Sequence, residues 1–416
     1  MTHHGVAPSR CRHCGGALEH TFCDLGMSPL ANSYRTVEDQ TATEAFYPLH
    51  VFVCGTCFLV QLPEAESPEG IFSDYAYFSS YSQSWLAHAE AYTQHMTARL
   101  GLSAASQVVE IASNDGYQLQ YFVERQIPVL GIEPAANVAR VAQDKGIPTR
   151  VAFFGADTAR ALRAEGVHAD LLLGNNVLAH VPRLHDFVEG MKILLKPDGV
   201  ITMEFPHLLR LMQQTQFDTI YHEHFSYFSF LAVEKVFAVH GLRLFDVAQL
   251  PTHGGSLRIF AAHESDASHS VSSSVAALRA EEIAAGLHDL STYSDFSEKV
   301  KRTKRSLLRF LIDARDRGET VVGYGAPAKG VTLLNYCGVR TDLLDYTVDL
   351  SPHKQNKMLP GVHIPIESPD RIRETRPDYL LILPWNLKDE IMQQMAHIRT
   401  WGGAFVVPIP DLEILL

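Results

Sequence analysis

The stretch Val108-Val109-Glu110-Ile111-Ala112-Ser113-Asn114-Asp115-Gly116-Tyr117 indicates the fold class of the central part of the chain. It reads as an apolar strand that passes into a turn of small residues and then into a helix. About twenty residues later, the stretch LGIEP ends a second apolar strand with Glu133. In a parallel sheet both strand ends lie on one edge, where Gly116 would let a cofactor approach the backbone and Glu133 could bind ribose hydroxyls.

This turn favours S-adenosylmethionine (SAM) over a dinucleotide, because it lacks the GxGxxG triad that cradles a pyrophosphate and SAM has no pyrophosphate. A third apolar run, LLLGNN, ends in two asparagines at the edge where such sheets open their cleft, and His180 follows it. Any doubly wound domain has tight turns and polar strand ends, so a structural role is the alternative. The candidate cofactor-binding residues are Glu110, Asn114, Asp115, Gly116, Glu133, Asn175 and Asn176.

Strand and helix patterns alternate outward from this stretch. The strands are QVVEIA, VLGIEP, LLLGNN and VITMEF, which predict a parallel sheet with helices on both faces. A second alternation, TVVGYG, YTVDL, DYLLILP and GGAFVVPIP, follows an amphipathic helix that we expect to stop at Gly318. We therefore predict an α/β protein with a small zinc-binding N-terminal module (1–72), a Rossmann-like SAM domain (73–277) and a C-terminal Rossmann-like domain (278–416).

The second alternation carries its own glycine motif, GYGAPAKG over residues 323–330, between a strand and a helix. Its backbone amides and Lys329 could hold phosphate oxygens, and Asp349 ends the next strand, where a ribose-binding acid would stand. Tight packing of a helix on a strand produces the same glycine pattern, so that role stays open. Lys354 and Lys357 close behind are also compatible with a solvated turn.

Four of the six cysteines form two CxxC pairs, Cys11 with Cys14 and Cys54 with Cys57. Each CxxC turn can present two thiolates to one tetrahedral Zn²⁺. Four protein ligands leave no open position for water, so we expect a structural zinc site; reduced thiols or a redox pair are the alternative. We expect the remaining pair, Cys23 and Cys337, to be ordinary buried thiols.

The stretch Tyr221-His222-Glu223-His224-Phe225 concentrates a phenol, two imidazoles and a carboxylate, groups that transfer protons near neutral pH. A metal site or a polar surface turn are the alternatives. The two histidines do not have the spacing of an HExxH metal motif.

Composition limits the range of partners. The formal net charge is -12, which argues against nucleic acid and anionic membranes as partners. No apolar run approaches the roughly 20 residues that span a bilayer, and the first ten residues contain no apolar signal-peptide core. We expect a monomeric cytoplasmic enzyme that binds neither nucleic acid nor membrane.

In combination, these motifs resemble those of the sugar C-3'-methyltransferases of actinomycete deoxysugar pathways, a three-domain family. The resemblance extends from Cys11 to near the C-terminus, and the placement of YHEHFSYF and GYGAPAKG makes it specific. It is carried by the paired CxxC motifs and by EIASNDG, GIEP, NNVLAHV, FDTIYHEHFSYFS, THGGSLRIF, GYGAPAKG and LILPWN.

The resemblance implies SAM in the middle domain, a dTDP-linked 4-keto deoxysugar between the middle and C-terminal domains, and zinc in the N-terminal module. It implies His224 as the general base, with Tyr221, Glu223 and His180 beside the reacting sugar. The implied substrate-binding residues are Tyr75, Tyr77 and Ser79, with Lys329 at the dTDP phosphates and, from the strand pattern, Asp349.

Carbon methylation needs an activated carbon, and a ketone at C-4' acidifies the C-3' proton. We expect His224 to remove that proton while Tyr221 or His180 donates a hydrogen bond to the enolate and Glu223 orients an imidazole or a sugar hydroxyl. The competing interpretations are a zinc-ribbon nucleic-acid methyltransferase, an NAD-dependent sugar-nucleotide oxidoreductase using 323–349, and a non-enzymatic sensor. No motif specifies the sugar or whether its C-3' carries amine or hydroxyl.

Overall fold

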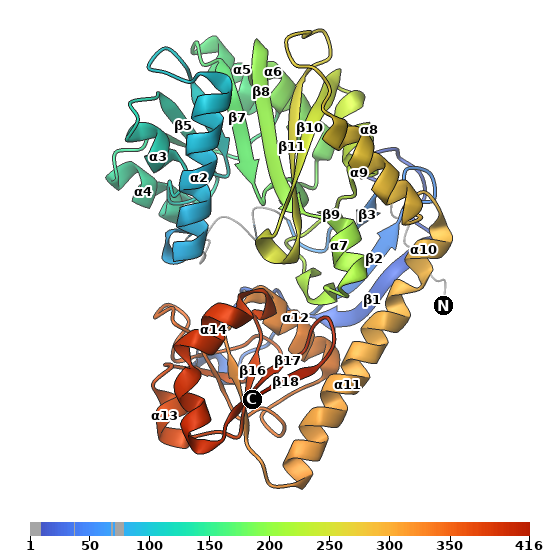
Figure 1. The fold of residues 1–416 in the computed structure, drawn as a ribbon, viewed down its shortest axis with the longest axis vertical. Helices are drawn as coiled ribbons and strands as arrows, with labels where there is room; N and C mark the ends of the chain where they lie inside the picture. The colour runs from blue at the N-terminus through green and yellow to red at the C-terminus, as the bar shows by residue number, and fades with distance from the viewer. Residues whose placement is uncertain (1–9, 37, 68–69, 71–78) are drawn as a thin grey trace. The chain divides into compact units, whose positions relative to one another are not determined.

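The computed structural model describes residues 10–36, 38–67, 70 and 79–416 (Figure 1). These residues form two compact units. Unit 1 combines the described residues of 1–19, 54–208 and 225–289, and unit 2 combines 20–53, 209–224 and 290–416. Neither unit is one continuous stretch of chain, and the N-terminal segment contributes to both. Within the described ranges, no helix is both long and apolar enough to cross a bilayer.

Unit 1 contains a seven-stranded sheet in the order β10-β11-β8-β7-β4-β5-β6. All pairs are parallel except those of β11, which runs antiparallel to β8 and β10. The chain moves outward from β4 to β6 and then crosses back to β7, so a topological switch point lies between β4 and β7. The strands are β4 Val108–Ile111, β5 Val129–Glu133, β6 Thr149–Val151, β7 Ala169–Asn175, β8 Leu195–Pro206, β10 Leu242–Leu250 and β11 Ser256–His263.

Helices cover this sheet, and α2 (Gln83–Leu100) lies along one face of it in Figure 1. Its buried residues Tyr92 and Met96 share a hydrophobic core with Phe122 and with strand residues such as Leu171. The helix begins at Ser82, whose side chain accepts from Trp85 N–H, and ends at Gly101 in the left-handed conformation. The other helices are α3 Leu119–Val123, α4 Ala136–Asp144, α5 Ala156–Ala164, α6 Leu184–Leu194, α8 Phe230–Ala238 and α9 Ser273–Ala284.

Unit 2 contains the second seven-stranded sheet, in the order β14-β15-β13-β12-β16-β17-β18. Its five central strands are parallel, and the edge strands β14 and β18 run antiparallel. Its switch point lies between β12 and β16. The strands are β12 Val321–Tyr324, β13 Thr347–Val348, β14 Lys357–Met358, β15 Pro365–Glu367, β16 Tyr379–Ile382, β17 Ala404–Val407 and β18 Glu413–Leu415.

The long helix α11 (Phe296–Asp316) ends as expected, with Gly318 in the left-handed region at φ 75°. It packs beside β1 (His20–Ser28), which pairs antiparallel with β2 (Tyr47–Val53); Figure 1 shows α11 along β1. The remaining helices of this unit are α10 Leu290–Ser294, α12 Ala328–Cys337, α13 Arg371–Thr375 and α14 Lys388–Gln394, and α7 Leu208–Gln213 begins at its boundary. The predicted α/β class with two Rossmann-like sheets is confirmed.

Candidate active site and metal centre

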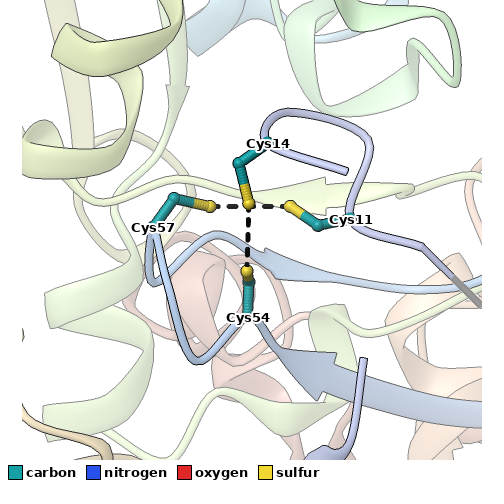
Figure 2. Close-up of side chains that lie close together, drawn as sticks. All are labelled: Cys11, Cys14, Cys54 and Cys57. Carbon is teal, nitrogen blue, oxygen red and sulfur yellow. Dashed lines mark hydrogen bonds between the residues drawn. The ribbon is translucent and has the colours of Figure 1, made fainter. Parts of the chain in front are cut away.

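The four paired cysteines meet in unit 1, with their sulfur atoms turned toward a common centre (Figure 2). Sγ of Cys11 lies 3.5 Å from that of Cys57, Sγ of Cys14 lies 3.4 Å from that of Cys54, and all four lie within 4.8 Å of one another. Zn–S bonds of about 2.3 Å in a tetrahedron place sulfur atoms about 3.8 Å apart. The donor set therefore fits Zn²⁺.

Groups around the cysteines would orient the thiolates. Gln61 Nε2 donates to Cys11 Sγ at 3.1 Å, and Thr56 N–H donates to Cys54 Sγ at 3.4 Å. Such contacts tune and orient metal ligands. The two other cysteines are buried as expected, and burial raises the pKa of the Cys23 and Cys337 thiols to about 12.

The turn after β4 lies at the switch point of unit 1 and is built on Glu133. Its carboxylate accepts from Asn114 N–H and from Ala135 N–H, each at 2.9 Å, which joins the ends of β4 and β5. Asn114 itself has φ 50°, and its Oδ1 accepts from Ser79 N–H at 2.9 Å. Gly116 has φ 78°, and a Cβ there would lie 2.3 Å from the Ile147 side chain. Packing and backbone conformation therefore require this glycine, whatever a cofactor adds.

Two carboxyl oxygens at this turn are candidates for ligand contacts. Oε2 of Glu110 and Oδ1 of Asp115 are buried and have no hydrogen-bond partner among the described residues. Burial, with the nearby charges of Glu133 and Asp115, holds the pKa of Glu110 well above its usual value. SAM offers ribose hydroxyls and an ammonium group as donors, so the residues present fit SAM.

Asn175 and Asn176 end β7 on the other side of the switch point. Asn175 Nδ2 lies 3.3 Å from the Tyr117 hydroxyl, so the two predicted cofactor motifs are in contact. Asn176 has φ 54° and lies 3.1 Å from Nε2 of His253, which also has a left-handed backbone at φ 55°. Left-handed residues other than glycine cluster at functional sites because their strain must be supported.

Sequence reasoning missed an aromatic and ionic group beside these asparagines. Trp85 stacks on His88 with ring centroids 5.0 Å apart and lies 5.2 Å from His253. His88 Nε2 and the Arg258 guanidinium both bond the buried Glu204 carboxylate, at 2.9 and 2.5 Å. The signal for Glu204 was its place in VITMEF, at the carboxyl end of a central strand.

His180 ends the short helix η3 (Leu178–His180) and is half-buried in unit 1. The preceding carbonyl, that of Ala179, accepts from Phe225 N–H at 2.8 Å. Ser79 is buried next to the turn after β4. Tyr75 and Tyr77 lie outside the described residues.

In unit 2, His224 is buried and its Nδ1 lies 2.8 Å from the Thr219 carbonyl. A carbonyl only accepts, so Nδ1 carries the hydrogen and the neutral imidazole keeps its lone pair on Nε2. The Tyr221 ring lies 4.0 Å from the His224 ring, between centroids. This tautomer is the one that a base acting through Nε2 requires.

The other two residues of the YHEHF stretch have different surroundings. Glu223 is buried and accepts from Asn32 Nδ2 at 2.6 Å. His222 is also buried, but its Nε2 lies 3.3 Å from the Pro48 carbonyl and its ring packs edge-on against Tyr47. Burial lowers the pKa of His222, so a neutral structural imidazole is favoured there. Residue type alone could not distinguish the two histidines, because only the fold supplies their partners; His224 was singled out by the family resemblance.

Lys329 lies at the switch point of unit 2, where it meets residues that follow β16. Its Nζ donates to Asn386 Oδ1 at 2.6 Å and lies 4.4 Å from the centre of the Trp385 ring. Trp385 Nε1–H donates to the buried Asp218 at 2.7 Å, and burial raises the pKa of Asp218 to about 6 against the opposing charge of Lys329. Burial in turn lowers the pKa of Lys329. Sequence reasoning missed the role of Asp218, Trp385 and Asn386.

The glycine loop after β12 is held from several sides. Asp349 accepts from Ala326 N–H at 2.7 Å and from Ser351 N–H at 2.8 Å, while the Tyr34 hydroxyl donates to the Ala326 carbonyl at 2.6 Å. Gly325 has φ 89°, and a Cβ there would lie 2.6 Å from Pro384. The loop therefore shows the tight packing named as the alternative, and Asp349 stabilises it. Contacts of Asp349 with ribose remain a prediction.

Comparison with known proteins gives matches along most of the chain. Three family models match: a "Putative zinc binding domain" over residues 11–72, a methyltransferase domain over 85–247 and a C-methyltransferase C-terminal domain over 251–410. The C-methyltransferase NovU of Streptomyces niveus is 37% identical over 405 residues, which are 97% of this chain and 96% of the relative.

Solved structures match part of the chain at low identity. The PH0226 protein of Pyrococcus horikoshii is 16% identical, with a TM-score of 0.37 over 45% of this chain and 94% of its own. Magnesium protoporphyrin IX methyltransferase of Synechocystis, with bound SAM, is 12% identical, with a TM-score of 0.33 over 43% of this chain and 79% of its own.

A sheet with this switch point, the acidic turn after β4 and a four-cysteine cluster define a zinc-containing, SAM-dependent methyltransferase. The family matches and the near full-length relative narrow this further. The chain belongs to the C-methyltransferase family, with SAM as methyl donor and zinc in its N-terminal cysteine cluster. The sequence-based prediction of this family is confirmed.

Proposed function

We propose that the enzyme methylates carbon 3' of a dTDP-linked 4-keto deoxysugar, with His224 as the general base. The observation that carries the proposal is the hydrogen bond between His224 Nδ1 and the Thr219 carbonyl. It fixes the tautomer with its lone pair on Nε2, which a base needs before substrate arrives. A polar surface turn, the alternative interpretation of this stretch, would not need a buried imidazole with a fixed tautomer.

The chemistry of carbon methylation determines what the protein must do. A C–H bond is not nucleophilic, whereas a ketone at C-4' lets the charge of a C-3' carbanion spread onto oxygen. His224 Nε2 takes the proton, and a hydrogen-bond donor stabilises the enolate oxygen. Bound SAM supplies the electrophilic methyl group that the carbon takes up.

The other candidate residues have subordinate roles in this proposal. Tyr221, whose ring lies against His224, or His180 donates to the enolate oxygen. Glu223, oriented by Asn32, holds a sugar hydroxyl or an imidazole. We assign cofactor binding to the unit 1 turns and substrate contacts to Tyr75, Tyr77, Ser79, Lys329 and Asp349, in a chain with three functional segments, 1–72, 73–277 and 278–416.

Two histidine variants test the base. His224→Asn should lower turnover about 10²- to 10⁴-fold at saturating SAM and sugar, the range for losing a general base. His222→Asn is the matched control, because His222 lies in the same stretch but bonds Pro48. We expect it to lower thermal stability while turnover stays within about threefold, since the imidazole bonded to Pro48 is not the base proposed here. Full turnover in His224→Asn would remove His224 from the role of base.

The substrate class needs its own experiment. A panel of dTDP-4-keto sugars incubated with enzyme and SAM should contain members that gain one methyl group, placed on ring carbon 3' by fragmentation in mass spectrometry. Methylation of an oxygen or nitrogen atom, or of free sugars only, would contradict the proposal.

A further inference from the structure

Arg12 lies inside the first CxxC turn, between the zinc ligands Cys11 and Cys14, yet its side chain bonds elsewhere. Its guanidinium is half-buried and donates to the Phe225 carbonyl, and at 2.8 Å to the Leu62 carbonyl. It also lies 5.7 Å from the centre of the Phe225 ring. The side chain therefore ties the zinc turn to the residue that directly follows His224 in the chain.

Phe225 is a junction of backbone hydrogen bonds within unit 1. Its carbonyl accepts from Leu62 N–H at 3.0 Å as well as from Arg12, and its N–H donates to the Ala179 carbonyl at 2.8 Å. The following residue, Ser226, pairs with Gln61 in the short ladder of β3 (Val60–Gln61) and β9 (Ser226–Tyr227). Phe225 is thus anchored on three sides, next to His224 in sequence and bonded to the residue before His180.

Gln61 connects the same junction to the metal site. Its Nε2 donates to Cys11 Sγ at 3.1 Å, and its Oε1 accepts from Arg12 N–H at 2.9 Å. A zinc ion that fixes Cys11 would therefore also fix Gln61 and the backbone of Arg12. From there the backbone N–H of Leu62 reaches the Phe225 carbonyl, and the Arg12 guanidinium adds a direct side-chain connection from the CxxC turn to the same carbonyl.

We propose that Arg12 is a positioning residue for catalysis: it transmits the order of the zinc turn to Phe225, and so fixes the point at which the loop carrying His224 ends. The inference rests on the proposed function, because it concerns the base assigned there. Displacing a reacting group by about 1 Å can cost about 100-fold in rate. A guanidinium suits this position because its planar fork reaches two carbonyl oxygens at once, whereas a lysine ammonium is a point charge on a flexible stem.

The test compares Arg12→Lys with Arg10→Lys. Arg10 precedes the same turn, but its side chain is exposed and its guanidinium donates to the Gly15 carbonyl at 3.1 Å, within the turn itself. We would measure zinc content, amide hydrogen exchange at Leu62 and Phe225, and loss of the C-3' proton to D₂O with S-adenosylhomocysteine and a dTDP-4-keto sugar. The last assay follows proton removal without methyl transfer.

We expect Arg12→Lys to retain one zinc per chain and to exchange its Leu62 and Phe225 amide hydrogens faster than the wild type. The rate of C-3' proton exchange should fall about 10- to 100-fold, while the KM for the sugar stays within about threefold. Arg10→Lys should match the wild type. Arg12→Ala should recover part of its proton exchange with added methylguanidinium, which keeps the test informative if the lysine variant is poorly folded.

Two results would overturn the inference: wild-type amide and C-3' exchange in Arg12→Lys, or loss of zinc as its primary defect, which would make Arg12 part of the metal site's own fold. A wild-type enzyme that exchanges no C-3' proton would instead count against the proposed reaction. The amide measurements would then still decide whether Arg12 orders Phe225.

Discussion

Asn32 donates its side-chain amide to the buried carboxylate of Glu223 at 2.6 Å, although 191 residues separate them in the chain. The Tyr34 hydroxyl, two residues on, bonds the glycine loop at Ala326. The segment between the two CxxC pairs therefore supports the candidate substrate residues of unit 2, and its role extends beyond connecting zinc ligands.

We predict that Asn32→Ala lowers kcat/KM for the sugar about tenfold, because removing one partner of a buried hydrogen bond costs roughly 1–3 kcal/mol. SAM affinity should not change, since Asn32 belongs to unit 2 and the turn after β4, which we propose binds SAM, belongs to unit 1. Steady-state kinetics with varied sugar, together with SAM titration calorimetry, checks both parts. Equal losses in sugar and SAM binding would point to general unfolding instead.

Asp218 should make unit 2 less stable as the pH rises. Burial raises its pKa to about 6, and the groups facing it are Lys329 and the Trp385 indole. Because the folded carboxyl binds its proton more tightly than the unfolded one, stability present at low pH is lost between about pH 4 and 6, by about 3 kcal/mol. We expect the wild type to lose Tm relative to Asp218→Asn as the pH rises. The difference in Tm, variant minus wild type, should be about 5 °C larger at pH 7.5 than at pH 4.5. A difference independent of pH would contradict this.

Glu204 in unit 1 should show the opposite dependence. Burial alone would raise its pKa, but the hydrogen bond from His88 and the charge of Arg258 hold it near 2. The folded carboxylate is therefore stabilising above its usual pKa, and this contribution is lost as the pH falls below about 4.5. Glu204→Gln should lower stability by about 3 kcal/mol at pH 7 and by much less near pH 3, measured as urea midpoints. An equal loss at both pH values would exclude this linkage.

Glu282 should be a stability residue of unit 1. Its buried carboxylate accepts from His207 Nε2 at 2.7 Å and from the N–H groups of Phe230 and Leu231, which begin α8. Glu282→Ala leaves these donors buried without their acceptor, so we expect a loss of about 3–5 kcal/mol. Glu281→Ala, at the neighbouring half-buried position, removes an acceptor for Gln249 Nε2 at 3.2 Å and should cost no more than about 1 kcal/mol. Thermal and urea unfolding distinguish the two variants.

Zinc should stabilise the fold without taking part in the reaction. Cys14→Ser should lose the metal and unfold at lower temperature, whereas Cys23→Ser, which changes a buried cysteine outside the cluster, should keep one zinc per chain. A weak chelator added to the folded enzyme should leave the rate unchanged, because four cysteines leave no open coordination position. Rapid, zinc-reversible inhibition without unfolding would show a catalytic metal.

Local pattern predicted a large part of this molecule. The period of apolar residues and the turns after strands indicated both Rossmann-like sheets, and Gly318 and the CxxC pairs marked a helix end and a metal site. These features depend on residues close in sequence or on a ligand set whose chemistry is distinctive. The density of titratable groups in YHEHF likewise predicted a proton-transfer stretch, which stays a prediction.

The partners of the individual groups in that stretch depend on the fold and could not be predicted from the sequence. His222 and His224 are indistinguishable by residue type, yet one bonds the Pro48 carbonyl and the other the Thr219 carbonyl. Periodicity and short spacings specify the α/β class, the turn after β4 and the cysteine set, so these could be predicted from the sequence. The contacts of Asn32 with Glu223 and of Arg12 with Phe225 join residues about two hundred positions apart, and such contacts exist only once the burial of apolar surface has brought distant segments together.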